Sequence, residues 1–129
     1  MAITPVKILV AEAKAEIDSL SPANALAEAD AGRALLVDIR DIRELDREGR
    51  IPGAFHSPRG MLEFWVDPAS PYFKDALGQA PRLILFCASS WRSALSAKAL
   101  RDMGLTNVAE IDGGFSAWRK DGLPVEVKS

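Results

Sequence analysis

Two short apolar runs constrain the fold of this chain more than any other feature. Residues 34–39 read Ala-Leu-Leu-Val-Asp-Ile, and residues 83–86 read Leu-Ile-Leu-Phe. Apolar side chains are nearly continuous in both, which is typical of strands buried on both faces of a parallel sheet. A third short run, at 108–111, predicts a further strand of the same sheet.

Helix signals separate these strands. Ser21-Pro22 provides a capping hydroxyl followed by proline at the first helical position, and Asp112-Gly113-Gly114 predicts a turn into a last helix. Apolar residues recur at helical spacing from about Trp91, and Gly104 ends that helix. Strands that alternate with helices predict an α/β fold with a mainly parallel central sheet and helices on both faces.

The first 20 residues are predicted to form an amphipathic helix, followed by one domain over residues 21–129. The apolar residues at helical spacing are Val6, Leu9, Val10, Ala13, Ile17 and Leu20. We expect this helix to pack on the core of its own domain, with binding to a partner as the alternative. Charged residues interrupt the segment, and no apolar run approaches the roughly 20 residues of a membrane span, so a soluble, cytoplasmic protein without a secretory signal is expected.

Composition argues against several classes of function. A formal net charge of −2 gives no reason to expect nucleic acid or a membrane surface as partner. The single cysteine, Cys87, cannot form an internal disulfide. With His56 as the only histidine, the usual zinc ligand sets cannot be assembled, so neither a metal nor a cofactor is predicted.

Cys87 lies where a reactive thiolate is expected. It follows the predicted strand 83–86 directly and precedes a helix, and ligands of parallel sheets bind beyond the carboxyl ends of the strands. Unpaired N–H groups at the start of a helix favour negative charge, and Arg92 adds a positive charge nearby. The alternative is that Cys87 is a small buried hydrophobic residue. Its position favours the functional interpretation.

Other polar residues are predicted to have structural roles. A general-base role for His56 is less favoured than a structural hydrogen bond. Asp38 is expected to cap backbone donors near the Cys87 loop, and Arg40 to form a local ion pair with Glu44. Trp91 is expected to shield the site from water, to pack in the core, or both.

The ordered motifs of the chain resemble those of the rhodanese-like domain. The resemblance runs from about Ser21 to Val125 and rests on 37–40 (Val-Asp-Ile-Arg), Glu44, 50–54 (Arg-Ile-Pro-Gly-Ala), 86–87 (Phe-Cys) with the following loop, 112–115 (Asp-Gly-Gly-Phe) and Trp118. It implies the three-layer rhodanese-like fold. Arg50 departs from the family, which often has histidine before Ile-Pro-Gly-Ala, and this puts the local hydrogen bonding in question.

The resemblance implies a sulfurtransferase with Cys87 as the nucleophile. In the family, a loop cysteine takes the outer sulfur of a donor such as thiosulfate and passes it from a persulfide to a thiophilic acceptor. The implied substrate-binding residues are Ala88, Ser89, Ser90, Trp91, Arg92 and Ser93. Arg59 is expected either to reach the same site or to form a surface salt bridge.

The partners implied are a small sulfur-containing anion as donor and a thiol, cyanide or a protein as acceptor. The sequence leaves the physiological pair and the oligomeric state open. One alternative is a cysteine phosphatase, but those enzymes place arginine six residues after cysteine, whereas Arg92 is five residues after Cys87. The other is a non-catalytic or redox-sensing interaction module.

Overall fold

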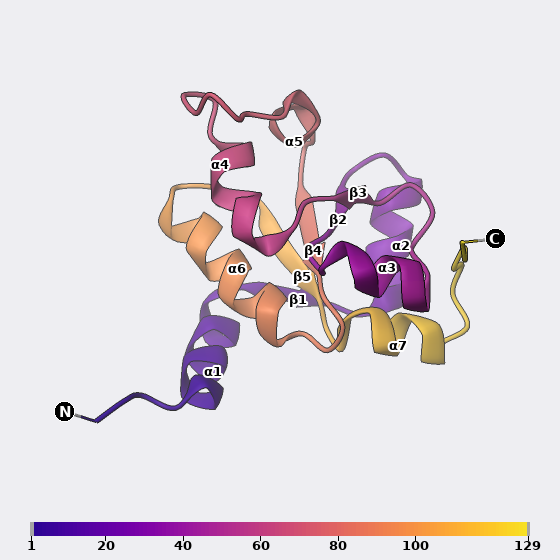
Figure 1. Cartoon of the computed structure of the whole chain (residues 1–129), viewed down its shortest axis with the longest axis horizontal. Coiled ribbons are helices and arrows are strands. Elements are labelled where there is room, and N and C mark those ends of the chain that lie inside the picture. The colour runs from indigo at the N-terminus through magenta and orange to yellow at the C-terminus, as the bar shows by residue number, and fades with distance from the viewer. Residues whose placement is uncertain (1, 129) are drawn as a thin grey trace.

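A five-stranded sheet forms the centre of the protein in a computed structural model that describes residues 2–128 (Figure 1). The strands are β1 (Asp18–Leu20), β2 (Leu35–Asp38), β3 (Phe55–His56), β4 (Leu83–Phe86) and β5 (Val108–Ile111). Their spatial order is β1-β5-β4-β2-β3, and every pair is parallel. The carboxyl ends of all strands therefore meet at one edge of the sheet.

Helices cover both faces of the sheet, as the sequence predicts. The helices are α1 (Val6–Glu16), α2 (Pro22–Asp30), α3 (Ile42–Glu48), η1 (Arg59–Met61, a 3₁₀ turn), α4 (Leu62–Val66), α5 (Asp75–Gln79), α6 (Trp91–Asp102) and α7 (Gly114–Lys120). The three-layer α/β prediction is confirmed. Across residues 2–128, no helix has the length and apolarity needed to cross a bilayer.

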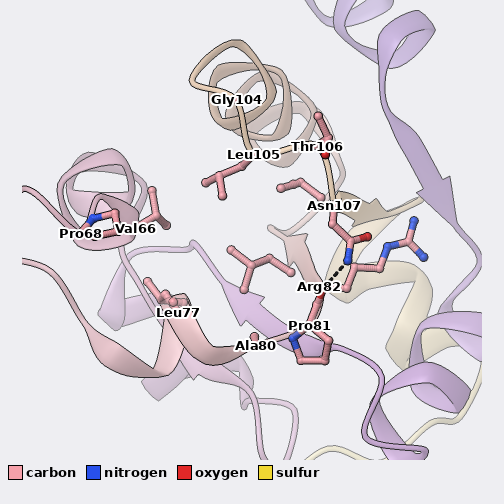
Figure 2. Close-up of a pocket in the computed structure, with 13 residues that line it drawn as sticks. Val66, Pro68, Leu77, Ala80, Pro81, Arg82, Gly104, Leu105, Thr106 and Asn107 are labelled. Atoms are coloured by element: carbon pink, nitrogen blue, oxygen red, sulfur yellow. Dashed lines mark hydrogen bonds between the residues drawn. The ribbon is translucent and has the colours of Figure 1, made fainter.

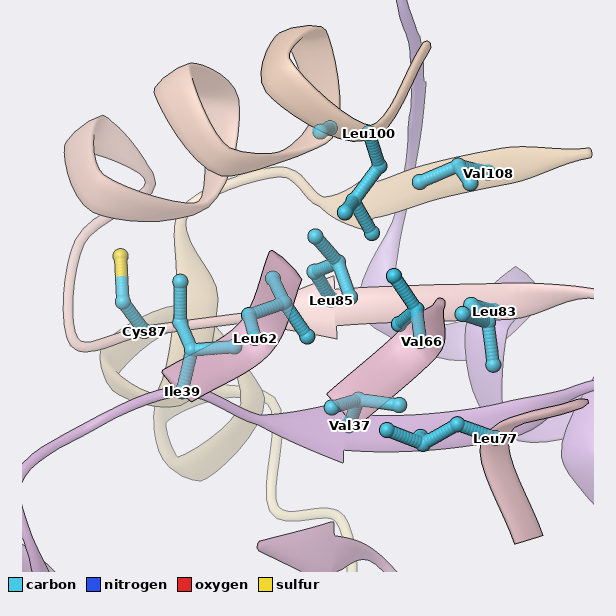
Figure 3. Close-up of a cluster of buried hydrophobic side chains, with 11 residues drawn as sticks. Val37, Ile39, Leu62, Val66, Leu77, Leu83, Leu85, Cys87, Leu100 and Val108 are labelled. Atoms are coloured by element: carbon cyan, nitrogen blue, oxygen red, sulfur yellow. The ribbon is translucent and has the colours of Figure 1, made fainter. Parts of the chain in front are cut away.

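The alternation of side chains along β4 builds two cores. Leu83 and Leu85 point into one cluster with residues of α4, α5 and α6 (Figure 3), whereas Ile84 and Phe86 face α2 and α7. On the second face Trp118 is fully buried, and its indole N–H donates to the carbonyl of Pro124 at 2.7 Å. Burial of a large apolar side chain contributes about 1.5–3 kcal/mol, so the two clusters together hold both helical layers on the sheet.

The first 20 residues differ from the predicted helix. The helix α1 ends at Glu16, and Asp18–Leu20 continue as the edge strand β1, paired with Ala109–Ile111 of β5. On one side of α1, Val10 and Ala13 pack on Ala94 of α6. The helix prediction is wrong beyond Glu16 because strand pairing with β5 provides hydrogen bonds that the spacing of apolar residues does not reveal.

The first turn of α7 holds the Cys87 loop at close range. The N–H groups of Phe115 and Ser116 donate to the carbonyls of Cys87 (2.8 Å) and Ala88 (3.0 Å). Gly114 directly precedes Phe115 and has φ +59°, and a β-carbon there would collide with the Cys87 carbonyl oxygen and the Ala88 backbone. Glycine is needed at this position both for its backbone conformation and for the close approach.

We expect Gly114→Ala to destabilise the protein more than Gly122→Ala. Both glycines have a positive φ, but a β-carbon at Gly122 meets no atom within 4 Å. Both variants should lose free energy of unfolding through backbone strain. Overpacking should lower it by about a further 1–3 kcal/mol in Gly114→Ala. Urea unfolding of the two variants measures the difference, and equal losses would contradict the close-approach argument.

Candidate functional site

Cys87 lies at the carboxyl-terminal edge of the sheet, between the ends of β2 and β5. It is the first residue after β4, and Ser90 precedes the first turn of α6. Figure 3 shows the Cys87 sulfur at the end of the apolar cluster that lies beneath α6. The residue is only 1% exposed, so its side chain is buried by the cluster and by its own loop.

Two backbone N–H groups point at the Cys87 sulfur. Those of Ser90 and Ser93 donate to Sγ over 3.2 and 3.4 Å. Ser90 has φ +99°, the one positive value among the non-glycine residues of 2–128, and this left-handed conformation turns the loop back over the sulfur. The loop therefore presents donors to Sγ, an arrangement that stabilises a negatively charged sulfur.

The remaining predicted loop residues have different surroundings. Ala88 is half-buried and lines a cavity of about 270 Å³ that also involves Phe115 and Arg119. Ser89 is exposed, and Trp91 is 49% exposed, so Trp91 is not a core residue. The core role predicted for Trp91 is therefore wrong, and shielding of the site stays a prediction.

Arg92 is held by a carboxylate from α3. Its two terminal nitrogens donate to the two oxygens of Glu44 at 2.8 and 2.9 Å. The hydrogen bonds from Arg92 hold the pKa of Glu44 below its ordinary value of 4.5, although burial acts in the opposite direction. The same bonds raise the pKa of the Arg92 guanidinium, and the nearby Cys87 contributes in the same sense. The pair fixes a positive charge beside the cysteine loop.

The predicted Arg40–Glu44 pair is wrong. Arg40 is fully buried and bonds instead to Asp38, with Nη2 at 2.7 Å from Oδ2, and to the carbonyl of Gly49 at 2.9 Å. Its guanidinium also stacks 4.1 Å from the ring centroid of Phe115. Asp38 accepts from the backbone N–H of Arg40, so its predicted capping role is confirmed. The Nη1 of Arg40 also lies 3.8 Å from Glu48 of α3, so the buried cation pairs with Asp38 and with a different acid of that helix than the predicted one.

His56 and Arg59 also lie near the carboxyl-terminal edge. The Nε2 of His56 donates to the carbonyl of Arg40 at 2.7 Å, which confirms the predicted structural hydrogen bond. The backbone N–H of Arg59 donates to the carbonyl of Ile39, which follows β2, while its side chain is exposed. Arg59 has no ion-pair partner in residues 2–128, so the predicted surface salt bridge is not found.

Sequence reasoning missed a buried acid below the loop. Glu110 in β5 is fully buried and accepts hydrogen bonds from the hydroxyls of Ser90 (2.5 Å) and Ser93 (2.7 Å). Lys14 of α1 lies 3.6 Å from the same carboxylate. The available signal was an acidic residue inside the otherwise apolar run 108–111, which is unusual for a strand covered on both faces.

A larger cavity lies at the opposite edge of the sheet (Figure 2). Its volume is about 360 Å³, and Leu83 and Val108, the first residues of β4 and β5, line it. Asn107 donates to the carbonyl of Pro81 at its rim. The described part of the chain groups no three His, Cys, Asp or Glu side chains in a way that could hold a metal ion. The chemical groups that could act together are those around Cys87.

Comparison with known proteins connects this site to one family. The family model for the rhodanese-like domain matches residues 21–121. A sulfurtransferase from Allochromatium vinosum is 31% identical over 85% of this chain and 92% of its own length. The thiosulfate sulfurtransferase GlpE of Pseudomonas entomophila is 35% identical over 81% of this chain and 86% of its own.

Solved structures show the same fold. A Rhodopseudomonas palustris protein of unknown function, described as a possible tyrosine phosphatase, has a TM-score of 0.91 at 46% identity and covers 98% of this chain and 97% of its own. The polysulfide-sulfur transferase homodimer of Wolinella succinogenes has a TM-score of 0.75 at 30% identity, with 95% and 88% coverage. These neighbours confirm the predicted rhodanese-like fold.

We expect the Glu44–Arg92 pair to make stability depend on pH. Because the pKa of Glu44 is lowered in the folded state, its contribution is complete above 4.5 and is lost as pH falls through the folded pKa. Glu44→Gln should therefore lower the free energy of unfolding by about 1 kcal/mol at pH 7 and flatten the decline of stability below pH 4.5. Urea unfolding across that range measures it, with exposed, unpaired Glu63→Gln as control. Parallel curves for Glu44→Gln and the wild type would contradict the expectation.

Proposed function

Since this chain belongs to the rhodanese-like family, we propose that it is a sulfurtransferase that carries sulfur on Cys87. Relatives named as sulfurtransferases, at 31–43% identity, support a transferase of this family. The donor proposed for assay is thiosulfate, and the proposed acceptors are cyanide, a thiol or a protein. Cytoplasmic localisation stays a prediction.

The proposed reaction has two displacement steps at sulfur. The Cys87 thiolate attacks the outer sulfur of thiosulfate, the S–S bond of the donor breaks, and sulfite leaves with its electron pair. An acceptor nucleophile then attacks the outer sulfur of the Cys87 persulfide and restores the thiolate. With cyanide as acceptor the product is thiocyanate. Neither step requires an external oxidant or reductant.

The observation that carries this proposal is the pair of N–H groups aimed at the Cys87 sulfur. A persulfide is anionic and extends into the loop that begins at Cys87. The bonds from Ser90 and Ser93 show donors already turned inward, at 3.2 and 3.4 Å. Donors fixed before reaction stabilise developing charge without reorganisation, and one such donor contributes about 3 kcal/mol in acyl transfer.

The burial of Cys87 supports a small donor. With the residue 1% exposed, Sγ is accessible only to a small reagent. The outer sulfur of thiosulfate is a single atom at the end of a compact anion, which meets this requirement. Arg92, 35% exposed in its side chain, provides positive charge beside the loop for this anion.

The loop length favours sulfur transfer over phosphate chemistry. Arg92 is five residues after Cys87, one fewer than in cysteine phosphatases. A shorter ring of N–H groups suits a single sulfur atom better than a tetrahedral phosphate. The description of the Rhodopseudomonas neighbour as a possible phosphatase applies to that protein.

We expect thiosulfate to add one sulfur atom to the reduced protein. Intact-mass spectrometry should detect the addition on the wild type and its removal by cyanide, with thiocyanate released. Cys87→Ala should gain no mass, because the nucleophile is absent. Loading of the Cys87→Ala variant, or no loading of the wild type by thiosulfate, would reject thiosulfate transfer through Cys87.

We expect Arg59→Ala to raise KM for thiosulfate several-fold and to leave kcat nearly unchanged. An unpaired surface cation near the end of β2 would attract an anionic donor before reaction rather than stabilise the transition state. Exposed Arg101, in the last turn of α6, is the matched control. Steady-state kinetics at low ionic strength measures both variants, and equal KM values would remove Arg59 from the donor site.

A further inference from the structure

Glu110 is an ionisable group within an apolar layer. The strand β5 is buried along its whole length, and the Glu110 carboxylate lies on the side of the sheet that α6 covers. A carboxylate in such a place must be stabilised by hydrogen bonds or by an opposite charge. The structure provides both.

Three hydroxyls donate to this carboxylate. Its Oε1 accepts from Ser90 (2.5 Å) and Ser93 (2.7 Å), and its Oε2 accepts from Ser19 of β1 (2.6 Å). Ser90 and Ser93 are the residues whose backbone N–H groups donate to the Cys87 sulfur. Glu110 therefore accepts hydrogen bonds from the hydroxyls of the same two residues whose backbone N–H groups donate to the sulfur.

Glu110 also determines which way the Ser93 hydroxyl points. A serine has one hydroxyl proton, and in Ser93 it is donated to Glu110. The Ser93 oxygen is then an acceptor for the Cys87 thiol, 3.6 Å away. In this orientation the Ser93 hydroxyl donates no hydrogen bond to the sulfur, and Glu110 adds a negative charge next to Ser93.

Lys14 opposes this effect from α1. Its Nζ donates to the Ser90 hydroxyl and to Asp112, both at 3.1 Å, and lies 3.6 Å from Glu110. Burial disfavours the ammonium, but the contacts with Asp112 and Glu110 outweigh it and hold the pKa of Lys14 above its ordinary value of 10.5. Lys14 lies outside residues 21–121, the part that the family model matches.

We propose that Lys14 and Glu110 are positioning residues that together set the charge beneath the Cys87 loop. Through Lys14, the helix α1 then contributes to the site. Their relevance to sulfur transfer rests on the proposed function, whereas their effect on the thiol does not. The other charged groups around the loop are Arg92 of α6, Glu44 of α3 on that arginine, and Asp112 after β5. Lys14 offsets the negative charge that Glu110 places next to Ser90 and Ser93.

The test measures the pH profile of Cys87 modification in opposite charge variants. Lys14→Met leaves Glu110 uncompensated and should raise the midpoint of the modification-rate profile by about one pH unit. Glu110→Gln removes the negative charge and should lower that midpoint. Lys14→Arg should restore the wild-type midpoint. The reagent is methyl methanethiosulfonate, which is small enough for a buried thiol. Lys7→Met, on the exposed side of the same helix, is the control.

Opposite shifts in the two variants, with an unchanged Lys7→Met profile, support the proposal. A purely structural role would lower the melting temperature without moving the midpoints in opposite directions, and unchanged midpoints or shifts of the same sign overturn it. Glu110→Gln is nearly isosteric and decides the question alone if Lys14→Met does not fold. Because no sulfur donor is used, failure of thiosulfate loading would reject the proposed function and leave this result standing.

Discussion

The central position of β4 determines where every candidate functional group lies. Because β2 and β5 pair with β4 on either side, in parallel, the residues that follow these strands gather at one edge. Cys87, Asp112 and the Arg40 region are brought together in this way from distant parts of the chain. The bonds from α7 to the Cys87 and Ala88 carbonyls then fix the loop, and the N–H groups of Ser90 and Ser93 remain free for the sulfur.

Cys87 combines the two roles that its residue type allows. It belongs to the apolar cluster that includes Leu62 and Leu85, as a structural cysteine would. Its sulfur nevertheless contacts polar groups of the loop, as a reactive cysteine would. The apolar surroundings restrict access to small reagents, and the loop donors offset the cost of placing negative charge there.

Two cations near the loop are each bound by carboxylates. Arg92 pairs with Glu44, and Lys14 contacts both Glu110 and Asp112. In each pair a cation and a carboxylate come from different elements, so the pairs connect α6 to α3 and α1 to β5. Glu110 is fully buried, so removal of Lys14 would leave a desolvated carboxylate, whereas the Arg92–Glu44 pair is partly exposed. The loop is therefore sensitive to helices that do not contact the sulfur.

Local signals in the sequence were sufficient to predict most helices and strands and the position of Cys87 relative to them. The predicted strands 83–86 and 108–111 are β4 and β5, and Ser21 caps α2 by accepting from the N–H of Asn24. Such signals act between residues a few positions apart, through backbone conformation and side-chain period. They also place Cys87 directly after a buried strand, whatever the rest of the fold.

Only the tertiary structure decided the edge strand β1, the partners of Arg40 and Arg92, and the network around Glu110. The Lys14–Glu110 contact joins residues far apart in sequence, and the choice of Glu44 for Arg92 depends on how α3 lies against α6. The energies of these pairs depend on burial and distance, which exist only after the sheet has formed. The sequence by itself thus determined that Cys87 follows a buried strand, and packing decided which charges surround it.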